Sequence, residues 1–244
     1  MAAHGFTVLS CRTAHRHRRR HNKRRLLDGE TVMWFEAIGK QLGHPTRTVA
    51  GWFITKLLKF RNSVLEENAV RLCRILPGDT VLEVGHGPGV GLQSAAKLLT
   101  GPTGHLIGVD YSLYMHQMAS ELMKDLIASG KVTLYHCGVT AMPIADNTVD
   151  KVFHCNCYYF WPDLKKGTTE LHRVMKPGGL MVTTIRLSHV SVLASKGVMP
   201  GENWRPEAYM AALTDSGFTD VRMENEQHKS TTFQVIYATA SKTL

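Results

Sequence analysis

The sequence lacks the long apolar runs that membrane insertion and secretion require. Its 244 residues include no uninterrupted apolar stretch of about 20 residues, the length that spans a bilayer. The N-terminus has a basic tract, but no apolar segment follows to complete a signal peptide. Hydrophobic residues still make up 43% of the chain. We therefore expect no membrane span and one core-forming domain with an appendage.

Cysteine is sparse, and its spacing indicates neither disulfides nor a metal site. The sequence holds five cysteines, an odd number, and no Cys-x-x-Cys pair. His154, Cys155 and Cys157 are close together, but on one strand they cannot converge on a single ion. We therefore expect no metal site and a reducing, intracellular environment.

Positive charge is concentrated at the N-terminus. The net charge is +9, yet residues 1–25 contain eight of the 29 Lys and Arg residues and no acid, which leaves 21 basic against 20 acidic residues. We expect residues 1–27 to be a disordered basic tail, and nucleic acid to be a partner only through it. Such a tail suits a nuclear import signal, a nucleic-acid-binding arm, a mitochondrial presequence or a solvated segment without a partner. Because its arginines are consecutive rather than on one helical face, we favour the cytoplasm and leave the nucleus and mitochondrion open.

A helical lead-in is expected over residues 28–78, before a main domain over residues 79–244. Phe53, Leu57 and Phe60 recur at helical spacing in this segment. A helix just upstream of a ligand-binding strand either packs over the ligand as a lid or covers one face of the sheet. The spacing leaves both roles open.

Strands and helices alternate from Asp79 onward. We expect strands near 80–85, 105–110, 132–137, 149–155, 179–185, 219–225 and 231–240, and helices near 90–99, 112–128, 164–175 and 205–216. Repeated strand–helix–strand units with apolar strands predict a parallel sheet with helices on both faces. The loop between the last two strands is too short for a crossover helix, so that pair is antiparallel. The predicted fold class is α/β, with a seven-stranded, mostly parallel sheet that ends in an antiparallel hairpin.

A glycine-rich turn follows the first strand. In residues 79–91 an apolar run ends in glycines at alternate positions, and a helix then begins. The absent Cβ atoms let backbone approach a ligand, and the helix start offers unpaired N–H groups, which suits an adenosine-type ligand. A dinucleotide site would need G-x-G-x-x-G, but Val90 stands where the third glycine belongs.

The turn resembles the first motif of class I S-adenosylmethionine (SAM)-dependent methyltransferases, E/D-x-G-x-G-x-G. The resemblance extends over residues 79–240: Asp110 ends the second strand, Lys176-Pro177-Gly178-Gly179 precedes the fifth, and a hairpin closes the sheet. It implies a Rossmann-like fold, SAM as cofactor and methyltransferase activity (EC 2.1.1.-). Within the family, the small-molecule methylase group (methyltransferase type 11) is the most similar.

The resemblance assigns cofactor contacts to the strand ends. Backbone would pass beside the methionine and ribose moieties at Gly85, Gly87 and Gly89. Glu83 would face the cofactor's ammonium group or, alternatively, bond nearby backbone. His86 stands where the family usually has a small or polar residue, and we treat its contact with the cofactor's carboxylate as a hypothesis.

The adenosine half of the cofactor would lie at the second and third strands. Asp110 can accept two charge-assisted hydrogen bonds from the ribose hydroxyls. Tyr111 either stacks beside the adenine or packs at a helix start. The family often has an acid after the third strand, but this sequence has Gly138 there, so we expect backbone groups, Val139 or Thr140 to hold the adenine.

The acceptor should bind at the end of the fourth strand, where open α/β sheets hold their ligands. Asn156 is expected to contact the cofactor there. An aromatic stretch follows that resembles the Tyr-Phe-Trp-Pro-Asp segment of a bacterial methyltransferase subgroup. Its aromatics either wall the pocket and favour the cationic sulfonium or anchor the next helix. We assign the substrate pocket to Tyr158, Tyr159 and Trp161.

A catalytic base is not assigned. Methyl transfer requires an acceptor held about 3 Å from the activated carbon, and only some acceptors need a proton removed. Candidates for that step are His154, Tyr158 and Asp163. We expect transfer to a small-molecule acceptor. The alternatives are an RNA or protein methyltransferase recruited by the tail, a non-catalytic SAM-binding protein and, more distantly, an NAD(P)-dependent oxidoreductase.

Overall fold

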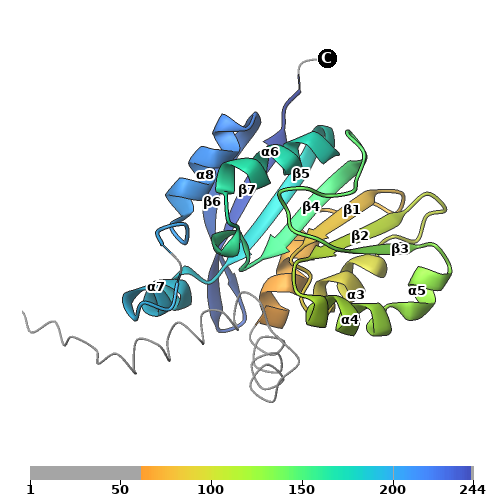
Figure 1. The fold of residues 1–244 in the computed structure, drawn as a ribbon, viewed down its shortest axis with the longest axis horizontal. Helices are drawn as coiled ribbons and strands as arrows, with labels where there is room; N and C mark the ends of the chain where they lie inside the picture. Colours follow the sequence, from red (N-terminus) through yellow and green to blue (C-terminus); the bar gives the residue numbers. More distant parts are fainter. Residues whose placement is uncertain (1–61, 200, 243–244) are drawn as a thin grey trace, which may run out of the picture.

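A seven-stranded sheet forms the centre of the molecule in the computed structural model, which describes residues 62–199 and 201–242 (Figure 1). The strands run in the order β3-β2-β1-β4-β5-β7-β6. Their bounds are β1 Thr80–Val84, β2 His105–Asp110, β3 Val132–His136, β4 Val149–Cys155, β5 Met175–Ile185, β6 Phe218–His228 and β7 Thr231–Ala240. The first five strands are parallel, and β7 is antiparallel to both β5 and β6. The predicted fold class is confirmed.

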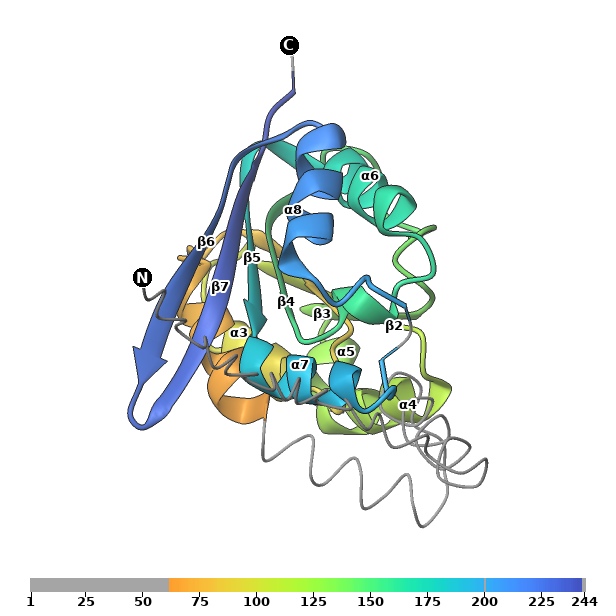
Figure 2. The same ribbon diagram turned by 90° about the vertical axis from the view of Figure 1, so that its left-hand side faces the viewer.

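Helices cover both faces of this sheet. They are α3 Val90–Ala96, α4 Leu113–Leu122, α5 Lys124–Ala128, the 3-10 turn η1 Tyr158–Phe160, α6 Leu164–Val174, α7 Leu187–Ser195 and α8 Pro206–Asp215. Residues 62–72 are also helical. Figures 1 and 2 show α3 and α4 on one side of the sheet and α6 and α8 on the other, with α7 beyond the carboxyl end of β5.

Strand alternation separates the apolar side chains into two cores. In β1, Val81 packs with Leu65, Leu92 and other side chains of the face covered by helix 62–72 and α3. The next residue, Leu82, joins the opposite core with α6 and α8. Successive strand side chains point to opposite faces, so a strand buried on both sides is apolar throughout.

Three elements depart from the sequence expectations. The helix expected over 112–128 divides at Met123, whose φ of −105° and ψ of 10° are not helical. β5 begins at Met175, earlier than expected, because the Lys-Pro-Gly-Gly turn is carried inside an irregular strand that pairs Val149 with Met175. α7 was not expected, since its serines and β-branched residues are weak helix formers.

The tail at residues 1–27 and most of the lead-in at 28–78 lie outside the described residues. The described end of the lead-in is helical, and its side chains Leu65, Ala69 and Cys73 are buried against the sheet. Within the described chain, no helix has the length and apolar character needed to cross a bilayer.

Candidate functional site

A cavity of about 730 Å³ opens at the carboxyl ends of the parallel strands. Its walls come from the glycine turn after β1, the ends of β2, β3 and β4, helix 62–72, η1 and α7. In this sheet β1 lies between β2 and β4, so the strand order reverses there. Open α/β sheets bind ligands at this reversal point, as expected from the sequence.

The glycine turn brings backbone to the cavity. Gly85 and Gly87 line it with φ of +67° and +52°, in the left-handed region that glycine adopts without steric cost. A Cβ on Gly85 would lie 3.0 Å from Cβ of Cys157. Gly89 does not line the cavity; it precedes α3, and a Cβ there would lie 3.1 Å from Leu122.

Asp110 is held at the cavity by two backbone donors. Its Oδ2 accepts from the N–H of Gly87 at 2.8 Å, and its Oδ1 accepts from the N–H of Ser112 at 2.7 Å. Each carboxylate oxygen has a second lone pair, so the group can accept further hydrogen bonds in a fixed orientation. This donor–acceptor arrangement suits the vicinal hydroxyls of a ribose.

Tyr111 and the segment after β3 form the next part of the wall. Tyr111 is 67% exposed, and a Cβ on Gly138 would lie 3.8 Å from its ring. Gly138, Val139 and Thr140 all line the cavity, as does Cys137. No carboxylate follows β3 at the cavity among the described residues, so backbone and Thr140 supply the polar groups there.

Glu83 lies behind the glycine turn and not in the cavity. Its side chain is 2% exposed and accepts a hydrogen bond from the backbone of Leu92. A Cβ on Gly91 would lie only 2.1 Å from its Oε1, so the fourth glycine leaves room for this carboxylate. Burial raises the pKa of Glu83 well above its usual range, and the charges of Glu66 and Asp110 add to the shift.

His86 is also turned away from the cavity. The side chain is fully buried, with Nδ1 2.8 Å from the carbonyl of Gly87, which makes Nδ1 the protonated nitrogen. Its ring centroid lies 6.3 Å from that of His116. Burial lowers the pKa of His86. The structure therefore does not bring His86 to a cofactor carboxylate.

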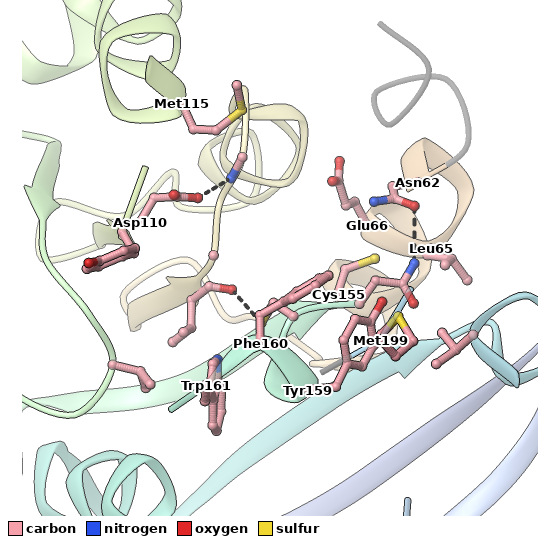
Figure 3. Close-up of a pocket in the computed structure, with 18 of the residues that line it drawn as sticks. Asn62, Leu65, Glu66, Asp110, Met115, Cys155, Tyr159, Phe160, Trp161 and Met199 are labelled. Atoms are coloured by element: carbon pink, nitrogen blue, oxygen red, sulfur yellow. Dashed lines mark hydrogen bonds between the residues drawn. The ribbon is translucent and has the colours of Figure 1, made fainter. Parts of the chain in front are cut away.

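Helix 62–72 contributes residues that the motif did not indicate. Asn62, Leu65 and Glu66 line the cavity (Figure 3). In Figure 3 the Glu66 and Asp110 side chains enter from opposite sides. Helical periodicity in the lead-in was the available signal, but it could not say which polar residue would face inward.

Asn156 connects three segments at the cavity wall. Its φ is 49°, a left-handed conformation that Asn tolerates better than most residues. Its Nδ2 donates to Oδ1 of Asn62 at 3.1 Å, and its Oδ1 accepts from the N–H of Arg186 at 3.3 Å. The end of β4 is thereby tied to helix 62–72 and to the start of α7.

The aromatic side chains of residues 158–161 have two different positions, three at the cavity and one buried in the core. Tyr159, Phe160 and Trp161 line the cavity. Tyr158 does not: it is fully buried, stacks on Tyr209 with ring centroids 4.3 Å apart, and donates to the carbonyl of Trp204 at 2.9 Å.

The candidate bases are all outside the cavity. His154 is fully buried, with Nε2 2.7 Å from the hydroxyl of Tyr209 and 2.8 Å from that of Thr183. Burial lowers its pKa to about 3, so it is neutral. Asp163 caps α6 and accepts from the N–H of Lys166. Ionisable side chains missed by the sequence reasoning do line the cavity, among them Glu66 and His189.

Comparison with known proteins identifies this arrangement. Residues 81–179 match the family model described as a methyltransferase domain. The chain is 27% identical over 168 residues to the uncharacterized methyltransferase YdaC of Bacillus subtilis, which covers 69% of this chain and 87% of YdaC. Residues 81–179 therefore form a methyltransferase domain, and these similarities support a class I SAM-dependent methyltransferase.

Further comparisons agree on the domain. Over 132 residues the methyltransferase is 32% identical to the ubiquinone/menaquinone biosynthesis C-methyltransferase UbiE of Geobacter sulfurreducens, covering 53% of this chain. The match spans about half, 51%, of UbiE. A solved SAM-dependent methyltransferase from Aquifex aeolicus shares the fold, with a TM-score of 0.58 and 22% identity over 76% of this chain and 96% of its own.

The cavity of the methyltransferase suits its cofactor. Left-handed glycines leave space beside the chain, and Asp110 presents oriented carboxylate oxygens. Within the described residues, no cluster of three or more His, Cys, Asp or Glu side chains could hold a metal ion.

Proposed function

We propose that the methyltransferase transfers the methyl group of SAM to a small-molecule acceptor bound between η1 and α7. The observation that supports this most directly is the cavity itself, whose volume of about 730 Å³ falls within the about 300–1,000 Å³ typical of small-ligand sites. Aromatic side chains line the cavity on the η1 side, and side chains of the α7 helix line it on the other. The relative UbiE is named as a ubiquinone/menaquinone biosynthesis C-methyltransferase, which agrees with a small-molecule acceptor.

We assign the cofactor to the β1, β2 and β3 side of the cavity. Asp110 would accept the ribose hydroxyls, Tyr111 and the 138–140 backbone would flank the adenine, and Gly85 and Gly87 would pass beside the methionine moiety. Glu83 is turned to the α3 backbone, so we assign the cofactor's ammonium group to Glu66, whose side chain lies at the cavity.

On the acceptor side, methyl transfer requires residues that orient the acceptor and exclude water from it more than it requires a base. Bound SAM supplies a methyl group on a cationic sulfonium. Tyr159, Phe160 and Trp161 present ring surfaces that exclude water and favour positive charge. A hydroxyl acceptor would lose its proton to His189, an acid–base side chain that lines the cavity.

The test is methyl transfer by the purified full-length protein. Calorimetry with SAM establishes cofactor binding, and labelled SAM is then incubated with fractionated small metabolites, RNA and protein extracts. Label in a small-molecule fraction supports the proposal. Label confined to RNA or protein contradicts it, as does SAM binding without transfer to any fraction.

Two variants sharpen that experiment. Asp110→Ala should abolish label in every fraction, while the matched exposed change Asp125→Ala should leave it intact. Removal of residues 1–27 should leave small-molecule labelling unchanged, because the residues to which we assign cofactor and acceptor contacts all lie between residues 62 and 199. Loss of labelling together with salt-sensitive RNA binding would favour the polymer alternative.

A further inference from the structure

The α7 helix presents basic side chains to the cavity from one side. Arg186 precedes the helix, His189 lies in its first turn, and Lys196 follows its last residue. All three line the cavity, together with the apolar Val190 and Leu193. Spacings of three and four residues put these positions on one helical face. Figure 2 shows α7 at the carboxyl end of β5.

Arg186 and Lys196 have no acidic partner among the described residues. Arg173, by contrast, is held by Asp146 at 2.5 Å and by Glu170 at 2.7 Å. The Nε of Arg186 is buried and has no hydrogen-bond partner within the described chain. Buried polar groups are nearly always paired, so this residue of the cavity lining has a guanidinium N–H left for an acceptor atom that the described protein does not supply.

Among the described residues, neither acid that lines the cavity forms an ion pair with Arg186 or Lys196. Asp110 is held by two backbone donors at the end of β2. Glu66 faces Glu83 and Cys155 closely enough for its charge to raise the pKa of both. Within the described residues, Arg186 and Lys196 thus have no carboxylate ion-pair partner, and they lie in the same lining as the aromatic side chains of η1.

We infer that the acceptor carries an anionic group, a carboxylate, sulfonate or phosphate, on an apolar or aromatic body. Arg186 binds the anionic group, and Lys196 attracts it at the mouth of the cavity. Val190, Leu193 and the η1 aromatics hold the apolar body. This inference rests on the proposed function, since it describes the acceptor of that same cavity. The cofactor's own carboxylate is the other source of the same chemistry, and the experiment distinguishes the two.

The test measures binding with matched probes, so it does not depend on turnover. Calorimetry is performed on the full-length protein saturated with S-adenosylhomocysteine, using 2-naphthoate against 2-naphthol and octanoate against octanol. In at least one pair the anionic member should bind at least tenfold more tightly, about 1.4 kcal/mol. Arg186→Gln should reduce that preference to less than threefold, and Lys196→Gln should reduce it by a smaller factor and weaken its salt dependence.

The control is Lys97→Gln, which removes one charge from an exposed position after α3 and should keep the full preference. Thermal unfolding verifies that each variant is folded, and the exposed Lys196 offers a test that does not disturb the core. No preference for the anion in either pair contradicts the inference. So does an Arg186→Gln variant that loses affinity for S-adenosylhomocysteine while keeping the preference, because Arg186 would then bind the cofactor. Failure of methyl transfer with an intact preference would count against the proposed function alone.

Discussion

The cofactor half and the acceptor half of the cavity are built in different ways. The cofactor half comes from strand ends and one contiguous turn, and its contacts are largely backbone: Gly85 and Gly87 line it, and Asp110 is fixed by two N–H groups. The acceptor half is assembled from η1 and α7, which are far apart in the sequence, and the side chain of Asn156 bonds the start of α7 to helix 62–72. A single contiguous turn therefore determines much of the first half, whereas the second depends on contacts between distant segments.

The largest effect should follow from breaking the cofactor half at Asp110. Asp110→Ala removes the proposed ribose contacts and leaves the N–H of Gly87 without its partner, at about 1.5–3 kcal/mol for each charge-assisted bond. We expect affinity for SAM to fall by at least about 100-fold, measured by calorimetry. Retained affinity would remove Asp110 from the cofactor site, and Asp110→Asn should be intermediate.

A change behind the glycine turn tests whether the cofactor half is as rigid as its backbone contacts indicate. Gly91→Ala places a Cβ 2.1 Å from Oε1 of Glu83. We expect the free energy of unfolding to fall by about 1–3 kcal/mol, as in other overpacked cores, measured by urea denaturation. In the double variant with Glu83→Ala the two losses should not add, because the clash is gone. Additive losses in the free energy of unfolding would show that the glycine turn shifts to relieve the clash.

Beneath the acceptor half, the buried His154 network should make stability depend on pH. The pKa of His154 is lowered to about 3, below the about 6.5 of an unfolded histidine, so between these values the unfolded chain binds more protons. Stability is therefore complete above about pH 6.5 and falls as pH decreases, by about 1.4 kcal/mol per unit from this group. Urea denaturation at pH 7.5 and 5 measures the slope. His154→Gln should flatten it, whereas His228→Gln on the hairpin should not; an unchanged slope in His154→Gln would contradict the assignment.

The smallest effect should separate the two neighbouring tyrosines of η1. Tyr158→Phe removes the hydrogen bond to Trp204 and should cost about 0.5–1.5 kcal/mol of stability with SAM affinity unchanged. Tyr159→Ala should instead alter acceptor binding, because Tyr159 lines the cavity. Chemical denaturation and calorimetry on both variants provide the comparison, and a loss of SAM affinity in Tyr158→Phe would place that residue nearer the cofactor than it lies here.

The same contrast explains what the sequence could predict. Asp110 was predictable at the cavity because it ends an apolar strand, and the carboxyl ends of parallel strands meet at one edge. The glycine turn was predictable because few residues other than glycine adopt its φ values. Gly89 and Glu83 show what the motif does not predict. It gives their spacing, but neither residue lines the cavity: Gly89 packs against Leu122, and the Glu83 carboxylate lies against Gly91.

The acceptor half offered weaker signals. Tyr158 and Tyr159 are adjacent and chemically alike, and only the stack on Tyr209, 51 residues further along, turns one inward. Arg186 and Lys196 were not singled out because α7 has no strong helical pattern. Contacts between distant segments create these positions, so a local pattern does not contain them.

The side chain of Asn156 links the two halves of the cavity. One amide side chain bonds the helix that carries Glu66 and the backbone from which α7 starts. A displacement of either wall must stretch or break a bond to the same group, so a ligand that draws α7 inward also bears on the position of the N-terminal helix. If binding at one end of the cavity shifts Asn156, thermodynamic linkage requires the effect on binding at the other end to be equal in both directions. The methyltransferase would sense through this one amide whether both of its substrates are in place.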